Sequence, residues 1–153
     1  MKEIVYIDTN IFVTFFLKRE GYKDIEDFFS NSLDLNIEYV TSEWTLTEIV
    51  KVLIREYNMS PNRANKYIEK LQREKRIGKA KFKFINSSQE AKYDCEELFY
   101  HLQKTILKYG GNIPDSLHAL IMKNNKIKHI LTTDSHFEGI RGIVVINPIS
   151  AQF

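Results

Sequence analysis

The stretch that decides the fold is Ile4-Val5-Tyr6-Ile7-Asp8-Thr9-Asn10, close to the beginning of the chain. The short apolar run favours a strand buried on both faces, as in a parallel sheet. Asp8-Thr9-Asn10 ends the run with turn residues, and a helical pattern follows from Ile11 to Leu17. A buried strand that leads directly into a helix predicts an α/β domain.

Strands and helices alternate along the rest of the chain. Further strands are predicted at residues 37–40, 82–85, 129–132 and 142–146, and further helices at residues 22–33, 41–57, 60–78, 87–108 and 114–124. Strands separated by helices predict a parallel sheet covered on both faces. We therefore expect one domain spanning residues 1–153, a three-layer α/β/α sandwich related to the Rossmann fold.

Composition excludes several classes of protein. The chain has 153 residues, of which 43% are apolar and 27% are charged, so disorder is not expected. The single cysteine, Cys95, excludes a disulfide within the chain, and its position in the apolar stripe of the 87–108 helix predicts a core residue. There is no apolar run of the roughly 20 residues needed for a membrane span, nor a signal peptide. We expect a cytoplasmic protein with no membrane contact.

The net charge of +2 conceals a polarised chain. Residues 51–83 contain eleven basic and three acidic residues, a net charge of +8, and the remainder carries −6. A basic segment of this kind is often only a solvated helical surface, but it also suits a phosphate backbone. Six basic residues are candidates for RNA binding: Lys51, Arg55, Arg63, Lys66, Lys70 and Arg73.

Four acids occupy positions where geometry matters. Asp8 and Asp134 follow predicted strands, and the carboxyl ends of parallel strands are where ligands bind in open α/β sheets. Asp115 follows Pro114 in the first turn of a helix. Glu48 lies in mid-helix, about 200° around from Leu46 and away from the apolar stripe, on the face that also carries Lys51 and Arg55.

Each of these acids has a simpler interpretation when taken alone. Asp8, Asp115 and Asp134 precede or open helices, where a carboxylate caps free N–H groups, and Glu48 could be a surface residue. The set of four in separate segments favours a shared site. Clustered carboxylates repel one another and need cations among them, and oxygen ligands select Mg²⁺ or Mn²⁺. Such ions activate water and stabilise the oxygens of an in-line phosphodiester attack.

The four segments resemble, in order and spacing, the motifs of the PIN-domain ribonucleases. The matching stretches are Asp8-Thr9-Asn10, Thr47-Glu48-Ile49, Pro114-Asp115-Ser116-Leu117-His118-Ala119 and Thr132-Thr133-Asp134-Ser135-His136-Phe137. The resemblance spans about Ile4 to Ile146. Among these ribonucleases, the chain is similar to the VapC-like toxins of toxin–antitoxin modules.

The resemblance implies Mg²⁺- or Mn²⁺-dependent cleavage of RNA. It makes Asp8, Glu48, Asp115 and Asp134 the catalytic metal ligands, and Asn10 and Thr133 supporting polar residues. It also implies a homodimer and a cognate antitoxin partner. The chain departs from the pattern at His136, where many members have a further acid, and we interpret His136 as a surface or supporting residue. His118 could bond Asp115, but a packing role is the expectation.

Other functions fit parts of the sequence. A haloacid dehalogenase-type phosphatase also has Asp after its first strand, but it needs a second Asp where this chain has Asn10. A non-catalytic PIN-like module that binds RNA or protein would use the basic segment equally well. A PIN nuclease of RNA processing or decay, outside a toxin–antitoxin system, is a further alternative, and a purely structural domain would leave the acid set unexplained.

Overall fold

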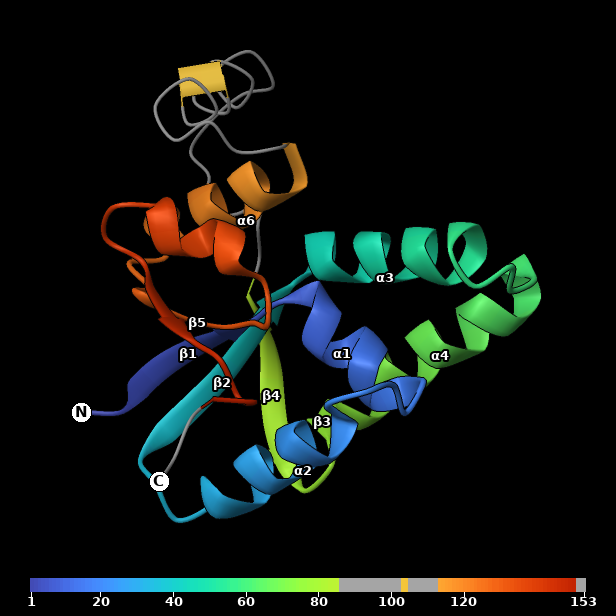
Figure 1. Ribbon diagram of the computed structural model, residues 1–153, viewed down its shortest axis with the longest axis horizontal. Helices are drawn as coiled ribbons and strands as arrows, with labels where there is room; N and C mark the ends of the chain where they lie inside the picture. The colour runs from blue at the N-terminus through green and yellow to red at the C-terminus, as the bar shows by residue number, and fades with distance from the viewer. Residues whose placement is uncertain (86–102, 105–112, 151–153) are drawn as a thin grey trace.

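The computed structural model describes residues 1–85, 103–104 and 113–150 (Figure 1). Its elements along the chain are β1 (Glu3–Ile7), α1 (Thr9–Phe16), α2 (Tyr22–Asn31), β2 (Ile37–Ser42), α3 (Glu43–Arg55), α4 (Pro61–Glu74), β3 (Arg76–Ile77), β4 (Ala80–Ile85), α6 (Ile113–Asn124), β5 (His129–Leu131), the 3-10 helix η1 (Ser135–Gly139) and β6 (Val144–Ile146). The predicted helix at 87–108, with Cys95, falls almost entirely outside the described residues.

One six-stranded sheet forms the centre of the fold, with the order β3-β4-β2-β1-β5-β6. β1 pairs in parallel with both β2 and β5, and β4 and β6 extend the sheet in parallel on either side. The predicted central parallel sheet is confirmed, and one short edge strand that the sequence did not predict, β3, pairs antiparallel with β4. Strand order reverses at β1, so its carboxyl end is the place where an open α/β sheet binds ligands.

The two faces of the sheet bury separate cores, which confirms the three-layer arrangement. Val5 and Ile7 of β1 point into a core formed with α1, α2, α3 and α4. Tyr6, between them, points to the opposite face, into a core that contains Ala119 and Met122 of α6. Figure 1 shows α6 on one side of the sheet and α1 to α4 on the other. A continuous apolar run in β1 is required because both of its faces are covered.

The helix predicted at residues 60–78, α4 in the structure, ends earlier than the sequence suggests. Ser60 caps α4 through its side chain, which accepts from the Arg63 N–H, but the helix ends at Glu74 rather than at Gly78. Lys75 takes a left-handed conformation (φ 47°) and starts the β3–β4 hairpin, in which Gly78 (φ 56°) makes the tight turn. Gly78 follows β3 and turns the hairpin, so this glycine marks the end of a strand and not the end of the helix that the sequence predicts.

None of the described helices combines the length and the apolar character that a membrane span requires.

Candidate metal site at the carboxyl ends of β1 and β5

Asp8 lies directly after β1 and is 5% exposed. Its Oδ1 accepts a 2.7 Å hydrogen bond from the Thr9 N–H at the start of α1, so the capping interpretation holds. Its Oδ2 accepts a 2.7 Å hydrogen bond from the Thr132 hydroxyl, which follows β5. The backbone N–H of Asp8 also donates to the Leu131 carbonyl at 3.0 Å. Asp8 is therefore fixed from both strands and does more than cap a helix.

Glu48 reaches the same region from α3. The buried residues of α3 are Thr45, Ile49 and Leu53, and Glu48 lies at the edge of that face rather than opposite it. Its side chain is 15% exposed, and its Oε1 accepts a 2.8 Å hydrogen bond from the Thr9 hydroxyl. Thr9 thus contacts both carboxylates, donating to Asp8 through its backbone and to Glu48 through its side chain.

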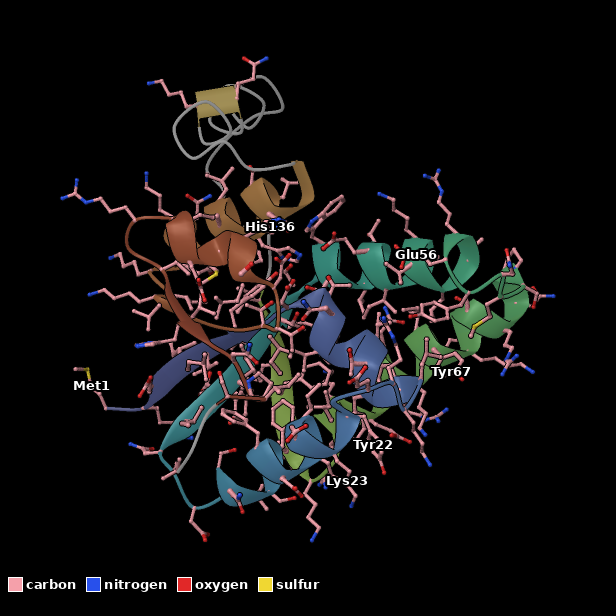
Figure 2. All side chains as sticks on the ribbon, viewed as in Figure 1. Met1, Tyr22, Lys23, Glu56, Tyr67 and His136 are labelled. Atoms are coloured by element: carbon pink, nitrogen blue, oxygen red, sulfur yellow. The ribbon has the colours of Figure 1, made fainter. Side chains whose placement is uncertain are left out.

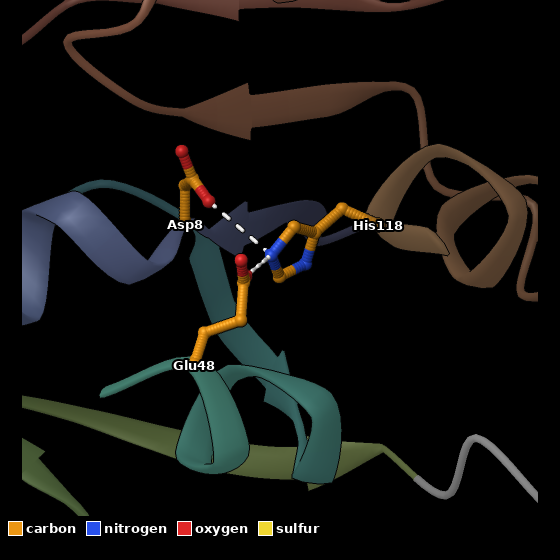
Figure 3. Close-up of side chains that lie close together, drawn as sticks. All are labelled: Asp8, Glu48 and His118. Atoms are coloured by element: carbon orange, nitrogen blue, oxygen red, sulfur yellow. Dashed lines mark hydrogen bonds and ion pairs between the residues drawn. The ribbon is translucent and has the colours of Figure 1, made fainter. Parts of the chain in front are cut away.

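His118 lies beside Asp8 and Glu48, and we call these three residues the first group. The sequence did not predict that His118 belongs to it. The ring, on α6, is fully buried, and its Nε2 contacts Glu48 Oε1 and lies 3.5 Å from Asp8 Oδ1 (Figure 3). Its Nδ1 lies 2.7 Å from the hydroxyl of Tyr6, which in turn lies 2.6 Å from the Ser42 hydroxyl. The expected packing role is confirmed, because the ring packs edge-on against Tyr6 and Phe137. The ring also reaches Glu48 of α3, a contact that the sequence did not predict.

The first group is held together by opposite charges. Burial raises the pKa of Asp8, although the charge of His118 opposes that rise. Burial alone would also raise the pKa of Glu48, but the hydrogen bond and charge of His118 outweigh it and the pKa is lowered. Burial alone would lower the pKa of His118, but Tyr6, Glu48 and Asp8 favour the charged ring and raise its pKa to about 10.

His118 is therefore an imidazolium at neutral pH and balances the two carboxylates beside it. Nε2–H donates to Glu48 and Nδ1–H donates to the Tyr6 oxygen, so both ring donors are satisfied. The sequence-based expectation that bound cations alone keep these acids together overlooks this charge, which the chain itself supplies.

Asp115 and Asp134 form a second group with His136. His136 Nδ1 lies 3.0 Å from Asp134 Oδ1 and 3.7 Å from Asp115 Oδ2. Asp134 caps η1 by accepting a 2.9 Å hydrogen bond from the His136 N–H. The two carboxylates are partly buried and the imidazole is exposed. The four predicted acids thus lie in two groups: Asp8 with Glu48, and Asp115 with Asp134.

Thr132 links the two groups. Its buried hydroxyl donates to Asp8, and it accepts a 3.0 Å hydrogen bond from the Asp134 N–H and one of 3.2 Å from Asn10 Nδ2. Asn10 thus contacts Thr132, and its supporting role stays a prediction. The described bond of Thr133 is a long one, 3.5 Å, from its backbone N–H to Asn10 Oδ1. The described side-chain hydrogen bond to Asp8 comes from Thr132, and the supporting role of Thr133 stays a prediction.

The six predicted RNA-binding residues are exposed. Lys51 and Arg55 lie on α3, and Arg63, Lys66, Lys70 and Arg73 lie on α4, opposite the face that buries Ala64, Ile68 and Leu71. α3 and α4 extend away from the sheet side by side, and nitrogen-tipped side chains surround them (Figure 2). Lys51 is tied to the site electrostatically, because its charge contributes to lowering the pKa of Glu48.

The carboxylates of both groups fit a divalent cation. In each group two carboxylates and one histidine bring possible ligand atoms within 4.8 Å of one another. The protonated ring of His118 has no lone pair for a metal, so the ligand atoms of the first group are the oxygens of Asp8 and Glu48. Carboxylate oxygens suit Mg²⁺ and Mn²⁺. In the first group the described hydrogen bonds of Glu48 use Oε1, so Oε2 is the oxygen that would turn to a metal.

Structural comparison gives matches over nearly the whole chain. VapBC2 from Rickettsia felis bound to a promoter DNA fragment aligns with a TM-score of 0.60 and 17% identity, covering 94% of this chain and 98% of that one. A toxin–antitoxin complex from Klebsiella pneumoniae gives 0.60 and 19%, covering 94% and 97%. FitAcB from Neisseria gonorrhoeae gives 0.63 and 15%, covering 96% and 99%. At these identities the likeness shows a shared fold.

Sequence comparison identifies the family. No curated protein matches the chain by sequence similarity. The family model of the PIN domain, however, matches residues 5–143, which include all four predicted acids and both groups around the ends of β1 and β5. The protein therefore belongs to the PIN domain family.

Proposed function

We propose that this protein is a metal-dependent endoribonuclease and acts as a VapC-like toxin. The observation that carries the proposal is the convergence of Asp8, Glu48, Asp115 and Asp134 in two groups joined through Thr132. Family membership supports a nuclease, since the site lies within the residues that the family model matches. The likeness to solved toxin–antitoxin complexes supports a toxin with a cognate antitoxin. The homodimer is proposed on the resemblance to PIN-domain toxins.

The proposed catalytic residues are the four acids, which would hold Mg²⁺ or Mn²⁺. When bound, such an ion activates water and stabilises the charge that develops on phosphate oxygens. Thr132 and Thr9 hold the Asp8 and Glu48 carboxylates in fixed orientations. Asn10 holds Thr132 in turn. Fixed ligands reduce the reorganisation needed during the reaction.

The six exposed basic residues of α3 and α4, which we call the basic face, would bind the RNA backbone. Lys51 and Arg55 lie on the helix that carries Glu48, so a phosphate contacted by them would be close to the acids. Arg63, Lys66, Lys70 and Arg73 on α4 would continue the contact along the strand. Exposed side chains of this kind contact phosphates without reading sequence, so they position RNA and do not select it.

Removal of metal tests the proposal. Purified protein should cleave single-stranded RNA in Mg²⁺ or Mn²⁺, lose cleavage in excess EDTA and regain it when Mn²⁺ is restored, because in the proposed mechanism the bound ion activates the water. Gel analysis of a labelled RNA gives the rate. Full cleavage in EDTA would refute the metal site. Binding without cleavage in every metal would instead favour the non-catalytic PIN-like module.

A further inference from the structure

His136 lies where a metal ligand would be placed between Asp115 and Asp134. Two ligands about 2.1 Å from one ion are about 3.0 Å apart at an octahedral angle and about 3.4 Å apart at a tetrahedral one. The observed separations of Nδ1 from the two carboxylates, 3.0 and 3.7 Å, lie close to these values. The three side chains can therefore share one ion with small adjustments.

The local structure fixes the backbone of His136 while its ring stays open to solvent. Asp134 accepts the His136 N–H at 2.9 Å, and the neighbouring Phe137 is fully buried in the second core. The His136 side chain is 71% exposed. An exposed contact between a histidine ring and a carboxylate contributes little to stability, so folding alone gives no strong reason for this arrangement.

We propose that His136 is a nitrogen ligand in the second group and that it shifts metal preference from Mg²⁺ toward Mn²⁺ and similar transition-metal ions. The proposal rests on the proposed function and concerns which ion that site takes. Mg²⁺ is bound through oxygen and retains its waters, whereas imidazole suits transition metals. A site of two carboxylates and one imidazole therefore discriminates between ions that an all-carboxylate site would accept more evenly.

Pulsed electron paramagnetic resonance of the Mn²⁺-loaded protein tests this directly, because nitrogen bound to Mn²⁺ gives a characteristic hyperfine coupling. The wild type should show the coupling, and His136→Asn should lose it. His129→Asn is the matched control, since His129 lies on β5 near Glu3 and outside both groups. Coupling that persists in His136→Asn would assign the nitrogen to another histidine and overturn the proposal.

Calorimetric titration gives a second readout. His136→Asn should weaken Mn²⁺ binding about tenfold or more. His136→Asp should lower the preference for Mn²⁺ over Mg²⁺, since it restores an oxygen ligand. Wild-type protein that cleaves RNA with Mn²⁺ but shows no nitrogen coupling would overturn this inference and leave the nuclease intact. Wild-type protein that binds no Mn²⁺ at all would overturn both.

Discussion

Asp8→Asn should reduce RNA cleavage by at least about a thousandfold, equivalent to roughly 4 kcal/mol of transition-state stabilisation. Asp8 contacts Thr9 and Thr132 and lies 3.5 Å from His118, so it is the acid most firmly placed by its surroundings. Asparagine has the same shape but no negative charge, and it would bind a divalent cation poorly. Single-turnover cleavage in saturating Mn²⁺ measures the effect.

The same substitution should leave the fold intact, which separates catalysis from stability. Burial raises the pKa of Asp8, which means that the ionised carboxylate does not by itself stabilise the folded state. Thermal unfolding in EDTA should stay within about 4 °C of the wild type, a change of roughly 1 kcal/mol. Asp27→Asn, at an exposed acid on α2, is the matched control and should change neither quantity. Cleavage by Asp8→Asn at the wild-type rate would remove this carboxylate from the mechanism.

Replacing Arg63, Lys66, Lys70 and Arg73 with glutamine should weaken RNA binding by about one to two orders of magnitude at low salt. Each phosphate neutralised on a single strand contributes about 0.7 to the slope of log affinity against log salt. If all four side chains contact phosphates, the slope should fall by about 3. Fluorescence anisotropy over a salt series, in an Asp8→Asn background that prevents cleavage, measures both quantities.

The control for this experiment has the same change in net charge at other exposed sites. Lys2, Lys23, Lys123 and Lys128 are exposed lysines outside α3 and α4. Their joint replacement with glutamine should lower the slope much less, because they lie outside the basic face. An unchanged slope in the α4 variant would assign that helix to dimer or antitoxin contact instead of RNA.

The sequence predicted the placement of Asp8 and Asp134 well because both follow buried strands. Parallel strands end at a common edge, and β1 and β5 are neighbours in the sheet. Predicting the positions of these two acids required only the apolar runs and the polar residues that follow them. Capping was also correct for both acids, so the two interpretations of each residue do not compete.

Sequence patterns could not predict the contact of His118 with Glu48. Glu48 and His118 are 70 residues apart, and their contact depends on how α3 and α6 approach the end of β1. Tyr6 faces His118 because alternate residues of β1 point to opposite faces, a relation that an entirely apolar strand conceals. The sequence also did not predict the contact of Thr132 with Asp8, because neighbouring residues of an extended segment point to opposite sides and the pattern does not show which side faces the acids.

Manganese location in a crystal tests the central claim most directly. A crystal soaked in Mn²⁺ should show anomalous density at about 2–2.4 Å from carboxylate oxygens of Asp8 and of at least one of Asp115 and Asp134. No anomalous density at either group in millimolar Mn²⁺, with the four carboxylates arranged as described, would contradict the metal site and the nuclease mechanism built on it.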